Sequence, residues 1–89
     1  MSPFLSGSAW AMARDISNGH VQVTDRTLRQ FSAAEMNKLT FEIDRHTREL
    51  RGDQPDLSDV GALRDRNQKL ARLTRVSRMI QLWRMESRR

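Results

Sequence analysis

The stretch FSAAEMNKLTFEI, residues 31–43, predicts the first long helix of this chain. Ser32 and Glu35 match a capping box, in which the hydroxyl and the carboxylate each accept from a backbone N–H that has no partner inside the helix. Phe31 and Met36 occupy the two apolar positions that fix how the chain enters such a helix. One helix face then carries a seam with spacings of three and four residues, at Met36, Leu39, Ile43, His46 and Leu50. We therefore expect a helix over residues 32–51.

A second and longer helix is expected after the turn at residues 52–55. Pro55 disfavours helical backbone for the residue before it and is compatible with the start of the next element. Asp56 or Ser58 would cap a helix over residues 57–86, which is about 45 Å long at a rise of about 1.5 Å per residue.

The first helix is too short to cover the second. An antiparallel hairpin pairs residues 36–50 with about residues 57–73, so residues 75–85 need another cover. Either a second molecule provides it, or the N-terminal segment folds back with three apolar side chains, Trp10, Met12 and Ile16.

The N-terminal part of the chain predicts one short helix after a flexible leader at residues 1–8. Ser8 would cap this helix over residues 9–17, and the Asn-Gly pair at residues 18–19 is a typical helix stop. At helical spacing, three apolar side chains share one side of it, namely Trp10, Ala13 and Ile16.

Residues 20–31 fit two structures. Val21 and Val23 alternate with polar residues, as in a half-buried strand, and a turn at residues 25–26 would return the chain as a β-hairpin. The alternative is a helical turn capped by Thr24. The predicted fold class is all-α or mainly α: a helical hairpin (32–51, 57–86) with a packed N-terminal segment, with the short β-hairpin at 20–31 preferred to the helical turn.

Composition fits one small domain over residues 1–89, with a basic tail at residues 87–89. There is no cysteine, which excludes disulfides, and no apolar run approaches the roughly 18 residues of a membrane span. We expect a cytoplasmic protein.

The net charge of +5 is concentrated at one end of the sequence. Residues 1–63 hold seven Lys/Arg against nine Asp/Glu, whereas residues 64–89 hold nine against two. Such an excess points to an anionic partner. The candidate nucleic-acid-binding residues, which would meet successive backbone phosphates, are Arg64, Arg72, Arg75, Arg78, Arg88 and Arg89. A solvated helix face is the simpler alternative.

The end of the long helix is apolar on nearly every side, although a surface helix should keep one polar face. This pattern predicts burial on more than one side, against the N-terminal segment, a second copy or a protein partner. The candidate partner-interface residues are Met79, Ile80, Leu82, Trp83 and Met85.

Nothing in the sequence predicts catalysis, a cofactor, a metal site or a small-molecule substrate. His20 and His46 are far apart and accompany no metal-binding pattern, and His46 is better explained as part of an apolar seam. The aspartates near residues 53–59 are explained by helix capping.

Residues 20–50, with the capped helix preceded by Val21-Gln-Val23, resemble the hairpin-then-helix segment of the gpW-like phage head-completion proteins. That resemblance implies a ring-forming part at the head–tail junction of a virion. The chain departs from the family in its short first helix and in the long helix after Pro55. We expect a small, basic, non-enzymatic adaptor or assembly protein, with nucleic-acid binding as the alternative.

Overall fold

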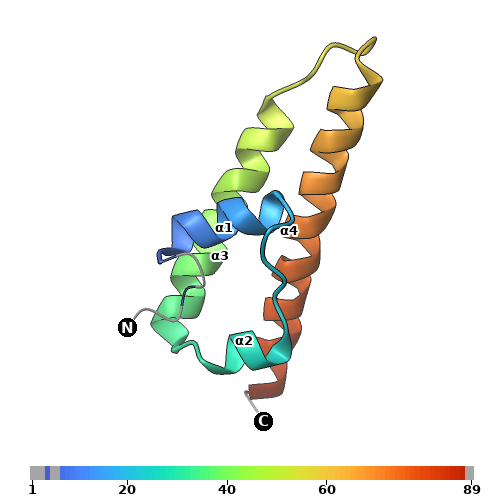
Figure 1. The fold of residues 1–89 in the computed structure, drawn as a ribbon. Helices are drawn as coiled ribbons and strands as arrows, with labels where there is room; N and C mark the ends of the chain where they lie inside the picture. Colours follow the sequence, from blue (N-terminus) through green and yellow to red (C-terminus); the bar gives the residue numbers. More distant parts are fainter. Residues whose placement is uncertain (1–3, 5–6, 88–89) are drawn as a thin grey trace.

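The computed structural model of the chain describes residue 4 and residues 7–87. This part of the chain forms four helices, α1 (Ala9–Ser17), α2 (Asp25–Arg29), α3 (Ala33–Gly52) and α4 (Val60–Ser87), and contains no strand. The expected mainly helical fold is therefore confirmed. α3 and α4 form an antiparallel hairpin, α1 packs across it, and α2 lies near the C-terminal end of α4 (Figure 1).

The capping box at the start of α3 is confirmed. The Glu35 N–H donates to Ser32 Oγ at 3.1 Å, and the Ser32 N–H donates to a Glu35 carboxylate oxygen at 2.9 Å. This second hydrogen bond holds the pKa of the Glu35 carboxyl below its ordinary value. Phe31 and Met36 are both buried, as their positions beside the cap predict. α3 ends at Gly52, as the sequence indicates.

The expected start of α4 is wrong. The helix begins at Val60 and its cap is Asp59, whose Oδ1 accepts from the Ala62 N–H at 3.0 Å. Asp56 instead accepts from the Ser58 N–H at 3.0 Å, and its carbonyl accepts from the Asp59 N–H at 2.9 Å. An aspartate that bonds the backbone two residues ahead closes a turn in place of a helix. Neither Asp56 nor Ser58 is therefore the cap.

The cap of α1 is confirmed, because the Ala11 N–H donates to Ser8 Oγ at 3.1 Å. Gly19 follows the helix with a φ of +80°, which is typical of a helix stop. The exposed fraction of Trp10 is 46%, so its placement on the buried side is wrong. The buried side of α1 is centred on other apolar residues, Met12, Ala13 and Ile16.

The preferred β-hairpin at residues 20–31 is wrong, and the alternative of a helical turn capped by Thr24 is confirmed. The Thr27 N–H donates to Thr24 Oγ1 at 3.4 Å, and the Thr24 N–H donates to Thr27 Oγ1 at 3.3 Å. This reciprocal capping starts α2 where a return strand would have to begin. Val23 is buried and Gln22 is exposed, so the alternation reflects an extended segment that has no partner strand.

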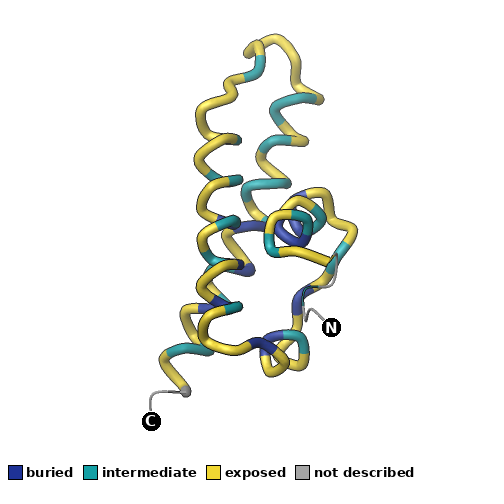
Figure 2. Tube along the Cα trace, turned by 90° about the vertical axis from the view of Figure 1, so that its left-hand side faces the viewer, coloured by how far each residue is buried: buried dark blue, intermediate teal, exposed yellow. Residues whose placement is uncertain are grey.

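One apolar core joins all four helices. From α4 it takes Leu73, Val76 and Ile80, which α1, α2 and α3 cover together. The N-terminal segment therefore supplies the cover that the hairpin lacks, through Met12 and Ile16 but not through Trp10. Between residues 44 and 72 no residue is buried, so the outer half of the hairpin is a two-helix arm beyond the core (Figure 2).

Much of the predicted leader and tail lies outside the described residues, namely residues 1–3, 5–6 and 88–89. Phe4 is described, and its ring packs edge-on against the Phe31 ring with 5.3 Å between the centroids. None of the described helices is long and apolar enough to cross a membrane.

Candidate interaction surface

The predicted partner-interface residues divide between the core and the surface. Ile80 is 1% exposed and belongs to the core, and Met79 and Trp83 are partly buried against it. Leu82 and Met85 remain 55% and 67% exposed. The excess apolar surface that the sequence predicts at the end of α4 is therefore reduced to these two side chains.

The predicted nucleic-acid-binding arginines also differ in their surroundings. Arg72 is half-buried and donates from Nη1 to the Ser17 carbonyl at 3.0 Å, so it ties α4 to the last turn of α1. Arg64, Arg75 and Arg78 are exposed and make no hydrogen bond or ion pair with another described residue. Arg88 and Arg89 lie outside the described residues.

Two further arginines of α4 have structural contacts. Arg66 Nε donates to the Leu50 carbonyl at 2.7 Å, near the end of α3, where backbone carbonyls lack partners inside the helix. Arg84 Nη2 donates to Asn37 Oδ1 and to Thr40 Oγ1 on α3. These two residues therefore fasten the two long helices together and are not part of a free basic face.

A shallow groove of about 540 Å³ runs along the face of α4 that no other helix covers. All of its lining residues belong to α4, and Arg75 and Arg78 are among them. Its apolar residues are Leu70, Ala71, Met79 and Leu82. The α4 groove therefore combines apolar surface with two cations that have no acceptor among the described residues.

Sequence reasoning missed part of this groove. Neither Leu70 nor Ala71 was among the candidate interface residues. The signal was present, because residues 71, 75, 78, 82 and 85 follow one another at spacings of four and three, as in a coiled-coil seam. Two of those five positions hold arginine, which hides the seam from a search for apolar residues alone.

The tip of the hairpin carries two aspartates whose carboxylates accept hydrogen bonds from backbone N–H groups. The hydrogen bond from the Ser58 N–H lowers the pKa of the Asp56 carboxyl, and Asp59 caps α4. Between them, Leu57 is 84% exposed, the most exposed of the large apolar residues described. The aspartates thus have structural roles, as the sequence indicates, and Leu57 lies on an otherwise polar turn.

The two histidines are far apart in the fold as well. His20 is exposed after α1, whereas the His46 Nδ1 lies 2.8 Å from the Glu42 carbonyl oxygen. The His46 ring lies 5.9 Å from the Trp10 ring, which in turn has the Arg14 guanidinium 5.1 Å from its centroid. Among the described residues, no three His, Asp or Glu side chains lie close enough together to hold a metal ion.

Comparison of the chain with protein-family models, with curated proteins and with solved structures finds no match in any of the three. The resemblance of residues 20–50 to gpW-like proteins therefore stays a prediction. The function has to be argued from the surface of the molecule itself.

Proposed function

We propose that this protein is a small, non-enzymatic adaptor in a cytoplasmic assembly, and that its α4 groove binds an acidic amphipathic helix of a protein partner. The observation that carries the proposal is that exposed apolar side chains, Leu82 and Met85, share one face with Arg75 and Arg78, which have no acceptor among the described residues. Helices that bind in grooves use a row of apolar anchors, and charges beside the row select the partner.

The charges favour a different protein over a second copy of this chain. A symmetric antiparallel pairing of the seam, which runs over residues 71–85, is centred on Arg78 and places this side chain against its own copy. A parallel pairing places both Arg75 and Arg78 against their copies. Like charges in contact across an interface destabilise it, so an acidic partner fits the groove better than self-association does.

The small side chain at Ala71 adds to the case for a helical partner. A helix approaches another most closely where a small residue lies on the contact line, and Ala71 lies one turn before the exposed residue Arg75 of the same seam. A partner with glutamates opposite Arg75 and Arg78 and leucines opposite Ala71 and Leu82 would match four of the residues that line the groove.

Nucleic-acid binding is the second candidate function, and three exposed arginines that have no acceptor in the described part of the chain favour it. A nucleic-acid backbone offers phosphates to Arg64, Arg75 and Arg78 but nothing apolar for Leu82 and Met85 to contact. Phosphate contacts would also make the affinity fall steeply as salt rises. The two candidates are therefore separable by whether Leu82 contributes to binding.

The test uses the full chain and a fluorescent synthetic helix that carries leucines and glutamates in the pattern given above. We expect binding in low salt that weakens about tenfold in Leu82→Ala. Truncation of a central apolar anchor commonly costs about 1–2 kcal/mol, and about 1.4 kcal/mol corresponds to a tenfold change in affinity. Leu57→Ala is the matched control, since it removes the same side chain from an exposed site on the hairpin tip. We also expect a monomeric mass in solution.

Labelled DNA and RNA oligonucleotides form the second arm of this experiment. Binding that depends on Arg75 and Arg78 but is unchanged in Leu82→Ala would replace the adaptor proposal by the nucleic-acid one. Failure of both probes to bind, or equal weakening by Leu82→Ala and Leu57→Ala, would overturn the assignment of the α4 groove. A stable dimer dissociated by Leu82→Ala would show that the groove binds a second copy.

A further inference from the structure

A polar cleft of about 270 Å³ lies between α3 and α4, beside the α4 groove. The cleft and the groove share two lining residues, Thr74 and Arg78, so the two adjoin along α4. Every residue that lines this α3–α4 cleft is polar or charged: Asp44, Thr47 and Arg51 from α3, and Thr74, Ser77, Arg78 and Gln81 from α4. A helix bound in the groove therefore has a polar surface along its flank on the α3 side.

The polar side chains of the α3–α4 cleft do not satisfy one another. Thr47 Oγ1 donates to the Ile43 carbonyl of its own helix at 2.8 Å. The side chains of the other six lining residues make no hydrogen bond or ion pair with any described residue. Nearer the two ends of the hairpin, by contrast, Arg66 and Arg84 cross from α4 to acceptors on α3. The donors of the cleft are therefore left to water or to a partner.

The charges in the cleft favour an anion. Arg51 and Arg78 bring two positive charges, one from each long helix, against the single carboxylate of Asp44. Both arginines are exposed, and their N–H groups have no acceptor among the described residues. The hydroxyls of Thr74 and Ser77 add further donors to the lining. Paired guanidinium donors suit a carboxylate, which can accept from both.

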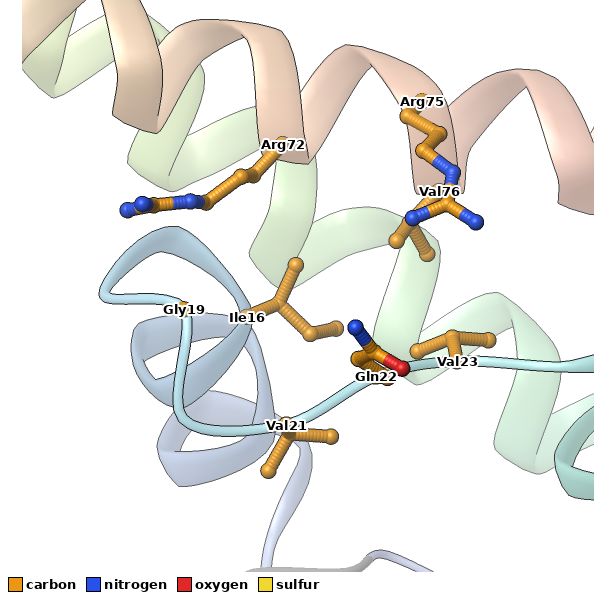
Figure 3. Close-up of a pocket in the computed structure, with 8 residues that line it drawn as sticks. All are labelled: Ile16, Gly19, Val21, Gln22, Val23, Arg72, Arg75 and Val76. Atoms are coloured by element: carbon orange, nitrogen blue, oxygen red, sulfur yellow. The ribbon is translucent and has the colours of Figure 1, made fainter.

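The arginines on the other flank of α4 face a different part of the chain. Figure 3 shows Arg72 extending over the turn at Gly19, and Arg75 on the side of α4 that faces the segment linking α1 to α2. Neither of them lines the α3–α4 cleft. Among the described arginines of α4, Arg78 is therefore the one at the boundary that the groove and the cleft share.

We infer that the α3–α4 cleft receives one carboxylate of the partner helix, that of the glutamate opposite Arg78, and that Arg51 on α3 binds it together with Arg78. This inference rests on the proposed function, because the partner is the acidic helix assigned to the α4 groove. Asp44 opposes the contact, since it repels the same carboxylate. The two glutamates of the partner thus differ: the one opposite Arg78 is bound from both long helices, and the one opposite Arg75 from α4 alone.

The test is a double-mutant cycle between the full chain and the fluorescent helix described above. Two further peptides carry glutamine in place of one glutamate, either opposite Arg78 or opposite Arg75. We expect Arg51→Gln to weaken binding of the parent helix about two- to fivefold, the range of an exposed ion pair. This effect should vanish with the peptide that has glutamine opposite Arg78 and persist with the other, because only interacting groups show such coupling.

Asp44→Asn should have the opposite sign. Removal of its negative charge from the cleft should tighten binding of the parent helix about twofold, and this gain should also depend on the glutamate opposite Arg78. Arg48→Gln is the matched control, since it removes an exposed arginine of the same helix that does not line the cleft. Any effect of this control acts through distant charge and should be equal for the two glutamine peptides.

The outcomes separate this inference from the proposed function. Binding that needs Leu82 but shows no coupling between Arg51 and the glutamate opposite Arg78 would overturn the inference and leave the groove assignment standing. Equal coupling of Arg48 and Arg51 to that glutamate, or weaker binding by Asp44→Asn, would also overturn it. Failure of the parent helix to bind would remove both proposals.

Discussion

Replacing Gly19 by alanine tests how the helical hairpin holds the N-terminal segment. Gly19 has a φ of +80°, and a Cβ there would lie 3.0 Å from the Arg72 Cζ, a tighter contact than most Cβ atoms make in folded proteins. The guanidinium would have to shift by a few tenths of an ångström, and it is this group that donates to the Ser17 carbonyl at 3.0 Å. The substitution therefore strains the turn and weakens the contact between α1 and α4.

The expected loss is the sum of two contributions. A positive φ costs an alanine roughly 1–2 kcal/mol. A hydrogen bond from a charged donor contributes about 1.5–3 kcal/mol, of which a displaced but flexible arginine loses part. We expect Gly19→Ala to lower the free energy of unfolding by about 2–4 kcal/mol. At about 4–8 °C per kcal/mol for a domain of this size, the melting temperature falls by 8 °C or more.

Urea denaturation followed by circular dichroism measures this loss, with two glycines as controls. Gly7 also has a positive φ, of +92°, but a Cβ there meets nothing within 4 Å, so Gly7→Ala isolates the backbone cost. Gly52 has no positive φ, and a Cβ there meets nothing within 4 Å. Gly52→Ala should therefore leave the free energy of unfolding unchanged or raise it by up to about 1 kcal/mol, because alanine is the better helix former. A Gly19→Ala effect that equals that of Gly7→Ala, or is undiminished in an Arg72→Ala background, would refute the reasoning.

Three further predictions concern the core and the helix caps. Leu39 is fully buried, so Leu39→Ala should cost about 2–5 kcal/mol in denaturant unfolding, against less than about 0.5 kcal/mol for Phe41→Ala at a site 59% exposed. Asp59→Ala should cost about 1 kcal/mol by the same assay and Ser58→Ala almost nothing, and equal losses would contradict the assignment of Asp59 as the cap. Because the pKa of Glu35 is lowered by folding, its carboxylate stabilises the fold above its unfolded pKa, and this contribution is lost as the pH falls through the folded pKa. The destabilisation by Glu35→Gln should therefore be largest above about pH 5 and disappear in more acidic solution, and an offset independent of pH would exclude this role.

The local signals in the sequence predicted the helices more reliably than they predicted their contacts. The box formed by Ser32 and Glu35 and the cap at Ser8 depend on side chains that bond the backbone within three residues, and both were confirmed. At residues 53–59 the same logic failed, because three aspartates compete and only one starts the helix. Asp56 closes a turn with Ser58, and Asp59 is the residue that caps the helix.

The candidate site was predicted only in part. The apolar excess near Met85 was visible in the sequence, but burial of Ile80 and partial burial of Trp83 depend on where α1 and α2 pack. The contacts of the arginines also depend on how the helices pack. Arg72 and Arg75 are equivalent in the sequence, yet one bonds the Ser17 carbonyl and the other has no acceptor among the described residues.

The sequence by itself determined the helical class, the two long helices and the concentration of positive charge in the last one, because these follow from spacing, capping and composition within short segments. Only the tertiary structure decided which side chains of α4 are covered, and thereby which of them stay exposed along the α4 groove. The physical reason is distance along the chain. Contacts such as that between Arg72 and Ser17 join segments more than 50 residues apart, and no local pattern specifies which of several similar residues will meet.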